Sequence, residues 1–247
     1  MLGQFICERG QAYNIIILAG GLGTRMGSAS EHIPKALTKI GSERAIDLLI
    51  NKFSLLAHKI IVGTGWHADL FESYIKGRYS NQHINFSRES ADDLRNNATS
   101  LLYALDNADS RFGTVVSFCD LLVLSNPVIS GSALYIANAE TKGVVGTFRH
   151  SVNITNALAS DVIAFDRPMS IDTISNGVIG LFVFSNTILL KELAYSLART
   201  NCLEDITTDL VSKYIKHQPT KVHEVNALIE FGNEADLDKA RLFWEKY

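Results

Sequence analysis

The spacing of apolar positions changes several times along the first 120 residues. Runs rich in β-branched residues at 15–18, 59–62 and 114–118 predict strands buried on both faces, as in a parallel sheet. Between these runs, apolar residues recur every three or four positions at 46–53 and 98–105, which predicts amphipathic helices. A further helix is expected at 68–76 and a short strand at 84–86. This alternation of strands and helices indicates an α/β fold.

The pattern becomes less regular after residue 120. Runs at 143–148, 157–165 and 177–184 predict strands, and the lack of a long helix between the last two favours an antiparallel or mixed part of the sheet. Asn126-Pro127 is typical of a helix start, with asparagine as the cap and proline at the first helical position. The other expected elements are a helix capped by Asn186, a helix at 203–214, a strand at 222–225 and a final helix from Glu234.

Together these elements predict a single-domain Rossmann-like α/β/α sandwich with a mixed, mainly parallel sheet. Residues 1–13 show no periodicity, so we expect them to be an N-terminal extension. The domain would then span 14–247. No linker, internal repeat or low-complexity tract divides it further.

Composition narrows the class of protein. The 247 residues are 47% hydrophobic and 20% charged, values near the globular average that exclude a disordered or collagen-like chain. With 23 Lys and Arg against 26 Asp and Glu, the net charge of −3 argues against a general nucleic-acid binder. Cys7, Cys119 and Cys202 have no CxxC spacing, which fits a reducing cytoplasm. No apolar run approaches the roughly 20 residues of a membrane span, so we expect a cytoplasmic protein without membrane contact.

The most informative segment is the glycine-rich stretch 18–27, which follows the first strand. A dinucleotide GxGxxG loop would need glycine in place of Met26, and a GxxxxGK[ST] loop would need glycine in place of Arg25. Glycines let backbone N–H groups approach an anion, and Arg25 and Lys35 add two cations. The alternative is a plain strand-to-helix turn, but such a turn needs no cations. Binding of a triphosphate needs them, because guanidinium binds phosphate oxygens bidentately and ammonium acts as a point charge.

Two motifs together carry a resemblance to a known family. Gly-Gly-Leu-Gly-Thr-Arg at 20–25 and Pro-Lys-Ala-Leu at 34–37 resemble the GGxGTR and PKxL signatures of the sugar-phosphate nucleotidylyltransferase superfamily, which has a GT-A-like nucleotide-diphospho-sugar transferase fold. The resemblance implies that Arg25 and Lys35 are catalytic and assist the departure of pyrophosphate. The nucleotide-binding residues that it implies in the loop are Leu18, Ala19, Gly20, Gly21, Gly23 and Thr24. Arg25-Met26-Gly27 is also similar to the methylerythritol-phosphate cytidylyltransferases and the molybdenum-cofactor nucleotidyltransferases.

The same resemblance implies a Mg²⁺ site. Asp120 follows the strand at 114–118, at the sheet edge where open α/β folds bind their ligands. An isolated aspartate there is usually a turn or cap residue, but the superfamily carries a Mg²⁺-binding acid at this place. Its second metal ligand follows a late strand and is asparagine in the N-acetylglucosamine-1-phosphate uridylyltransferases, which implies Asn226 here, with Glu224 as the rival. Hard oxygen ligands of this kind suit Mg²⁺.

A second resemblance concerns the branch of the superfamily. Asn96-Asn97, followed by Ser100 and a leucine, is similar to a motif of bacterial choline-phosphate cytidylyltransferases, so these three residues are expected to bind the nucleotide. Helix capping would explain one asparagine of the pair but not both.

The prediction of acceptor-binding residues rests on weaker matches to the same enzymes. Phe148-Arg149 resembles their Tyr-Arg pair, so Arg149 is the candidate for the acceptor phosphate, with a solvated surface arginine as the alternative. Gly177 resembles part of their acceptor wall. Glu204 could present an acid to the acceptor, although acids are also common where helices begin.

These resemblances predict a Mg²⁺-dependent cytidylyltransferase that couples CTP to a small phosphorylated or phosphonylated acceptor, such as a phosphocholine-like or surface-glycan precursor, and releases pyrophosphate. The halves at about 14–130 and 131–247 would bind the nucleotide and the acceptor. One alternative is a sugar-1-phosphate nucleotidylyltransferase that uses GTP or UTP. Another is an inactive nucleotide-sugar-sensing homologue, with which an asparagine at 226 is compatible. The sequence leaves open the acceptor, the nucleobase, and whether the protein is a monomer or a homodimer.

Overall fold

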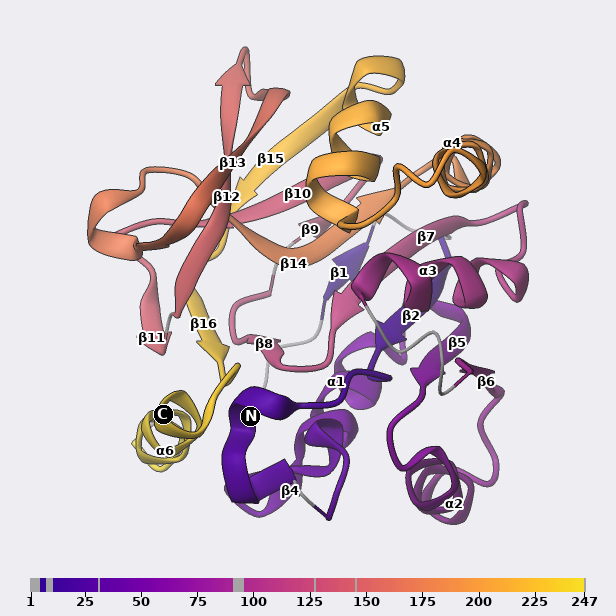
Figure 1. The fold of residues 1–247 in the computed structure, drawn as a ribbon, viewed down its shortest axis with the longest axis vertical. Helices are drawn as coiled ribbons and strands as arrows, with labels where there is room; N and C mark the ends of the chain where they lie inside the picture. Colours follow the sequence, from indigo (N-terminus) through magenta and orange to yellow (C-terminus); the bar gives the residue numbers. More distant parts are fainter. Residues whose placement is uncertain are drawn as a thin grey trace.

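The β-branched run at 15–18 lies at the centre of the parallel part of the main sheet, as its pattern predicts. It belongs to β2 (Tyr13–Leu18), which lies between β5 (Ala57–Thr64) and β7 (Gly113–Phe118), and β6 (Ile84–Arg88) extends the sheet beyond β5. These four strands are parallel, so their carboxyl ends meet at one edge of the sheet. The computed structural model describes residues 5–7, 11–30, 32–90, 96–126, 128–144 and 146–246 (Figure 1).

Beyond β7 the sheet becomes mixed. β14 (Gly177–Phe184) pairs antiparallel with β7, and the strands that follow in the sheet are β12 (Thr147–Thr155), β13 (Leu158–Ser170), β15 (Thr220–Glu224) and β10 (Ser132–Ala137). β10 also pairs antiparallel with β14, so this half of the nine-stranded sheet curls back on itself. The antiparallel part expected after residue 120 is therefore confirmed.

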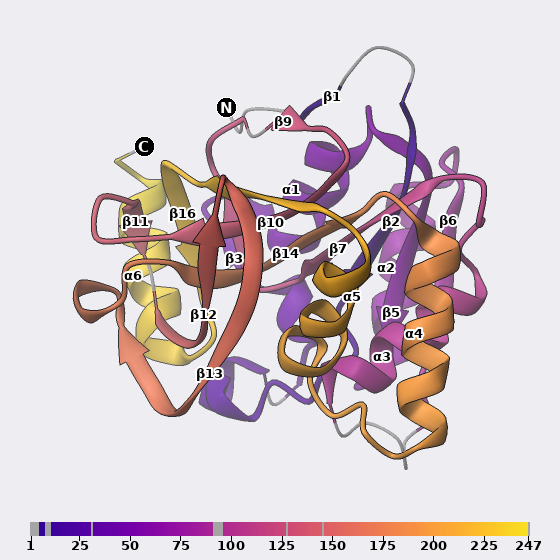
Figure 2. The same ribbon diagram turned by 90° about the horizontal axis from the view of Figure 1, so that it is seen from above.

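Helices cover both faces of the sheet (Figure 2). α1 (Ala45–Phe53) and α2 (Ala68–Arg78) pack on one face, and α3 (Asn97–Asp106), α4 (Thr187–Arg199) and α5 (Ser212–His217) pack on the other. Successive side chains of β2 alternate between the two layers: Ile15 and Ile17 join the core under α1, and Ile16 joins the core under α3. The α/β/α sandwich is thus confirmed. In the described part of the chain, no helix is long and apolar enough to cross a membrane.

A small second sheet lies beside the carboxyl edge of β7. It contains β8 (Leu121–Val123), β16 (Ala227–Glu230) and β11 (Lys142–Val144), with β16 in the middle, and α6 (Glu234–Trp244) packs against it. The remaining short elements are β1 (Ile6–Cys7), β3 (Lys39–Ile40), β4 (Glu43–Arg44), β9 (Val128–Ile129), the 3-10 helices η1 (Thr24–Ser30), η2 (Lys35–Leu37) and η4 (Ile171–Thr173), and the π-helix η5 (Ile206–Val211).

The prediction that a helix starts at Asn126-Pro127 is wrong. Pro127 lies outside the described residues, but the chain after it forms β9 and, following a turn at Gly131 with a φ of 66°, β10. Every residue of β10 is buried, so its apolar run is that of a strand buried on both faces. The run lacks the helical period that would have to follow a helix cap.

The segment before residue 14 takes part in the fold, although its sequence shows no periodicity. Phe5 is buried and stacks on Phe53 of α1, with ring centroids 4.7 Å apart. β1 pairs in parallel with β9, and Tyr13 is already the first residue of β2. Two isolated strand residues and one aromatic ring are too short a pattern to be recognised in the sequence.

Lys52 is a buried cation on the same side of the molecule. Its side chain in α1 is 2% exposed, its Nζ donates to the carbonyl of Ser125 (3.0 Å), and it lies 4.7 Å from the ring centroid of Phe5. Burial lowers the pKa of Lys52 from 10.5 to about 8. Between these two values the unfolded chain binds a proton that the folded chain does not, so Lys52 makes stability rise with pH over this interval.

We therefore expect the unfolding free energy of the natural chain to rise, relative to that of a Lys52→Met variant, by about 2 kcal/mol between pH 8 and pH 10. Urea unfolding at several pH values measures this difference. Lys213→Met, which removes an exposed lysine of α5, gives the effect of losing one positive charge. A constant difference between the natural chain and Lys52→Met across the interval would contradict the titration.

Candidate functional site

A glycine in the left-handed conformation and a buried side chain shape the glycine-rich loop after β2. Gly23 has a φ of 66°, a conformation that favours glycine, and the N–H of Met26 donates to the carbonyl of Gly23 (2.8 Å). The side chain of Met26 is fully buried and anchors the loop to the core. Arg25, next to this anchor, remains exposed above the carboxyl edge of the sheet.

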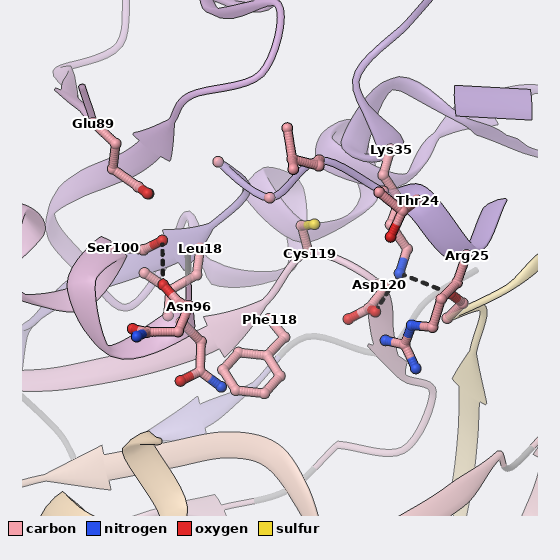
Figure 3. A pocket seen from close by; sticks show the side chains of 16 residues that line it. Leu18, Thr24, Arg25, Lys35, Glu89, Asn96, Ser100, Phe118, Cys119 and Asp120 are labelled. Atoms are coloured by element: carbon pink, nitrogen blue, oxygen red, sulfur yellow. Dashed lines mark hydrogen bonds and ion pairs between the residues drawn. The ribbon is translucent and has the colours of Figure 1, made fainter. Parts of the chain in front are cut away.

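A cavity of about 390 Å³ opens where this loop meets the carboxyl ends of the parallel strands (Figure 3). The predicted site residues that line it are Leu18, Gly20, Gly21, Gly23, Thr24, Arg25, Lys35, Asn96, Asn97, Ser100 and Asp120. Ala19 is buried instead, and its N–H donates to the carbonyl of Gly63 (3.1 Å). The structure therefore brings the arginine, the lysine and the aspartate to one cavity, and their roles in binding remain predictions.

Lys35 and Asp120 form an ion pair at one end of this cavity. Nζ of Lys35 lies 2.5 Å from Oδ2 of Asp120 and also donates to the carbonyl of Gly232 (3.4 Å). Burial alone would raise the pKa of the Asp120 carboxyl. The neighbouring ammonium outweighs burial, with help from the charge of Arg25, and keeps this pKa below its ordinary value. Asp120 is therefore a fixed anion.

Glu230 is a second carboxyl group near Asp120. It is the last residue of β16 and lies opposite Leu121, the residue that follows Asp120. The N–H of Phe231 donates to the carbonyl of Asp120 (3.1 Å), which ties the two segments together. Burial raises the pKa of Glu230 to about 7, and the charge of Asp120 adds to this shift. The sequence analysis missed Glu230, although an acid that ends an apolar run at 227–230 was a visible signal.

The residues expected as the second metal ligand lie elsewhere. Asn226 is exposed, and its carbonyl accepts from the N–H of Lys142 (3.0 Å). It precedes Glu230 by four residues, which corresponds to about 13 Å along a strand. Glu224 is also exposed, and neither Asn226 nor Glu224 lines the first cavity or the second one described below. The structure thus does not bring Asn226 or Glu224 to the cavity residues, because the chain forms one more strand, β16, before it reaches the second cavity at Glu230.

Asn96 and Asn97 begin α3 and make different contacts. Asn96 is the N-cap, and its Oδ1 accepts from the N–H of Thr99 (2.8 Å). Asn97 reaches the other half of the chain, where its Nδ2 donates to Oδ2 of Asp205 (3.4 Å) and its Oδ1 accepts from the N–H of Ile206 (3.2 Å). The second asparagine thus holds the start of α3 against η5.

A second cavity adjoins the first. Arg25, Asn97, Phe118 and Asp120 line both cavities. The residues that line only the second include Thr147, Phe148, Arg149, His150, Val178, Asp205, Thr207 and Glu230. The second cavity therefore has both cationic and anionic groups, with Arg149 exposed on its wall.

His150 and Asp205 form a polar contact on the wall of this second cavity. Nε2 of His150 lies 3.4 Å from Oδ1 of Asp205. Burial lowers the pKa of His150, and the nearby carboxylate of Asp205 only partly opposes the shift. The histidine therefore favours its neutral form near pH 7.

Two residues expected on the acceptor side lie just outside the second cavity. Glu204 is exposed, and the next residue, Asp205, lines the cavity instead. Gly177 is buried, and a Cβ at this position would clash with the ring of Phe148, 2.6 Å from its nearest atoms. The glycine therefore makes room for the ring of Phe148, which lines the cavity.

Three further residues that the sequence analysis missed line the first cavity. Glu89 is the first residue after β6 and Asp120 is the second residue after β7, so an acid after a strand was again the available signal. Phe118 lies over Gly180, where a Cβ would collide with the ring. Burial raises the pKa of Cys119 to about 12, so this thiol is neutral at physiological pH.

Comparisons with known proteins concern the family and the fold of the chain. Residues 15–207 match the family model described as a MobA-like NTP transferase domain. A search of curated protein sequences finds no match.

Several solved structures have a similar fold. The CTP:phosphocholine cytidylyltransferase from Streptococcus pneumoniae is 20% identical, with 94% of this chain and 98% of that chain covered and a TM-score of 0.71. The inositol-1-phosphate CTP transferase from T. maritima is 17% identical, with 97% of each chain covered and a TM-score of 0.70. The UDP-glucose pyrophosphorylase from Acinetobacter baumanii is 15% identical, with 94% and 93% covered and a TM-score of 0.71. At these identities the likeness concerns the fold.

Gly20 and Gly21 form a matched pair for testing how tightly the loop is packed. A Cβ on Gly20 would collide with the carboxylate of Glu89 and lie 3.3 Å from the backbone of Thr64, whereas a Cβ on Gly21 would meet nothing within 4 Å. We expect Gly20→Ala to lower the unfolding free energy by about 1–3 kcal/mol, and Gly21→Ala to change it by less than about 0.5 kcal/mol. Urea unfolding of both variants measures the contrast, and equal effects would contradict it.

Proposed function

The chain belongs to the family of MobA-like NTP transferase domains and is a nucleotidyltransferase, and from this premise we propose that it transfers the cytidylyl group of CTP to the phosphate of a small acceptor. The reaction forms a bond between an acceptor phosphate oxygen and the α-phosphorus, and breaks the bond between that phosphorus and the bridging oxygen. Pyrophosphate leaves with the electron pair of the broken bond. Family membership speaks against the alternative of an inactive sensor.

The observation that carries this proposal is the shared wall of the two cavities. An in-line displacement needs its attacking and leaving groups on opposite sides of one phosphorus atom. The first cavity holds the glycine loop with Lys35, the second holds Arg149, and Arg25 and Asp120 line both. A nucleotide in the first cavity and an acceptor in the second would therefore meet at this wall.

The first cavity supports binding of a triphosphate through charge. Lys35 and Arg25 supply two cations beside a loop whose glycines let backbone N–H groups come close to phosphate. In this arrangement the two side chains neutralise the charge that develops on the leaving pyrophosphate. No nucleophile from the protein is required, because the acceptor phosphate already carries a negative oxygen near pH 7. Catalysis would consist of positioning and charge neutralisation.

Asp120 and Glu230 fit the requirements of a Mg²⁺ ion. Both offer carboxylate oxygens, and the two segments are tied together by the hydrogen bond from the N–H of Phe231 to the carbonyl of Asp120. Burial is the main cause of the raised pKa of Glu230, and the charge of Asp120 adds to it. We propose that these two residues, and not Asn226, would hold the ion. When bound, it would supply positive charge to the phosphate oxygens of the nucleotide.

The second cavity supports a small acceptor with an anionic group. Arg149 can bind phosphate bidentately, and Asp205 and Glu230 supply anionic groups on the same walls. Neighbouring charges of both signs suit a phosphorylated amino alcohol, the class to which phosphocholine belongs. The fold shared with a CTP:phosphocholine cytidylyltransferase supports this choice. The fold shared with a UDP-glucose pyrophosphorylase keeps a sugar 1-phosphate as the second candidate acceptor.

A pyrophosphate-release assay tests the proposal. The purified chain, with MgCl₂, is given CTP, UTP, GTP or ATP together with phosphocholine, phosphoethanolamine, a phosphonate analogue or a sugar 1-phosphate. We expect the fastest release with CTP and a phosphorylated amino alcohol. Lys35→Ala should lower that rate by about 10²- to 10³-fold, because one preorganised cation is lost from the transition state. Release from UTP or GTP with a sugar 1-phosphate, and none from CTP, would replace the proposal by the second candidate.

Arg149→Ala tests the division of labour between the cavities. Because Arg149 lines only the second cavity, we expect the KM of the acceptor to rise by about 10- to 100-fold while the KM of CTP stays within about twofold. Steady-state kinetics with the best acceptor from the panel measures both constants. Arg199→Ala, an exposed arginine at the end of α4, is the matched control. A rise in the KM of CTP alone would assign Arg149 to the nucleotide.

A further inference from the structure

Asn97 uses both ends of its side-chain amide to contact η5, in the second half of the chain. Its Nδ2 donates to Oδ2 of Asp205 (3.4 Å), and its Oδ1 accepts from the N–H of Ile206 (3.2 Å). Asn96 differs, because its Oδ1 caps its own helix by accepting from the N–H of Thr99. The resemblance to cytidylyltransferases implies that both asparagines bind the nucleotide, but the amide of Asn97 connects the two halves of the chain.

Asp205 extends this connection with its other carboxylate oxygen. Oδ1 accepts from the N–H groups of Thr207 and Thr208 and so caps η5. The same oxygen lies 3.4 Å from Nε2 of His150 in β12. η5 is a π-helix, a rare conformation that is frequent at functional sites. We call Asn97, His150 and Asp205 the junction, because together they join α3, β12 and η5.

The junction lies where the two cavities meet. Asn97 lines both cavities, and His150 and Asp205 line the second. A different contact holds the far end of α3, where the hydroxyl of Tyr195 in α4 donates to Oδ1 of Asp106 (2.5 Å). Neither Tyr195 nor Asp106 lines a cavity. The same helix is thus held to the second half of the chain at both ends, and only one end is at the site.

The relative position of the two cavities matters for a transfer between them. An in-line displacement requires the attacking oxygen and the leaving group to be aligned with one phosphorus atom, and a misplacement of about 1 Å can cost about 10²-fold in rate. The glycine loop and α3 shape the first cavity, whereas β12, β14 and η5 supply walls of the second. Their alignment therefore depends on the contacts that join these elements.

Resting on the proposed transfer, we propose that Asn97 and Asp205 are positioning residues that align the second cavity with the first. They act by holding η5 against the start of α3, and neither side chain has to contact a substrate. Loss of their hydrogen bond should then lower kcat more than it raises the KM of either substrate.

An exchange of the two side chains tests this role. Asp205→Asn keeps the oxygen that caps η5 but turns an amide N–H₂ toward the amide of Asn97, and Asn97→Asp brings two carboxylates together. The double variant restores a donor and an acceptor with their places exchanged. We expect each single variant to lower kcat by about 10- to 100-fold with both KM values within about threefold, and the double variant to recover kcat to within about threefold of the natural chain.

Steady-state pyrophosphate release measures these constants, with the nucleotide and acceptor that give the fastest release in the panel. Asn97→Ala removes both amide contacts without adding a charge and should also lower kcat. Tyr195→Phe is the matched control, because it removes the contact at the far end of α3, and it should leave kcat unchanged. Thermal melts establish that each variant is folded at the assay temperature.

The outcomes separate this inference from the proposed function. A double variant no faster than the slower single variant would overturn the positioning role. So would a rise in the KM of the nucleotide alone in Asn97→Ala, or in the KM of the acceptor alone in Asp205→Asn, because each would make that residue a substrate ligand. In all these cases the natural chain remains active. A natural chain that releases no pyrophosphate with any pair of substrates would instead refute the proposed transfer, and the alignment with it.

Discussion

The contact between Lys35 and Asp120 is the constraint on which the site depends. Lys35 comes from η2 after the glycine loop, and Asp120 comes from the end of β7, so their ion pair fixes the loop against the edge of the sheet. With side chains 11% and 19% exposed, the pair is shielded from solvent, and removing one partner of a buried pair typically costs about 3–5 kcal/mol. The positions of this cation and this anion at the cavity are therefore set by the fold itself.

Much of the fold could be predicted from the sequence because its parallel half is locally encoded. The run at 15–18 is apolar at every position and the run at 59–62 at every position but Lys59, a pattern typical of strands buried on both faces. The second half depends on long-range pairing. β10 pairs with β15, whose sequence lies more than 80 residues away, and no local pattern reveals such a partner. The prediction of a helix at Asn126 was wrong because a capping residue marks a helix only where the following residues have a helical period.

The site shows the same division between local and distant information. Arg25, Lys35 and Asp120 belong to motifs or strand ends that can be recognised one segment at a time. Glu230 ends an apolar run, but its nearness to Asp120 follows only from the pairing of β16 and β8, which brings it opposite the residue after Asp120. Asn226, the expected metal ligand, lies before β16 and outside both cavities, whereas Glu230 at the end of that strand lines the second cavity. Glu204 lies outside the second cavity, while its neighbour Asp205 lines that cavity and caps η5.

The position of Gly232 in the chain has a consequence for biosynthesis. Its carbonyl accepts from Lys35, 197 residues earlier, and its backbone lies under the guanidinium of Arg25. At a translation rate of about 5–20 residues per second, the nascent chain has its parallel core well before this last strand and turn are made. Until then the ammonium and guanidinium groups have no cover from the C-terminal turn, so an incomplete chain can be folded at its centre and yet lack a site.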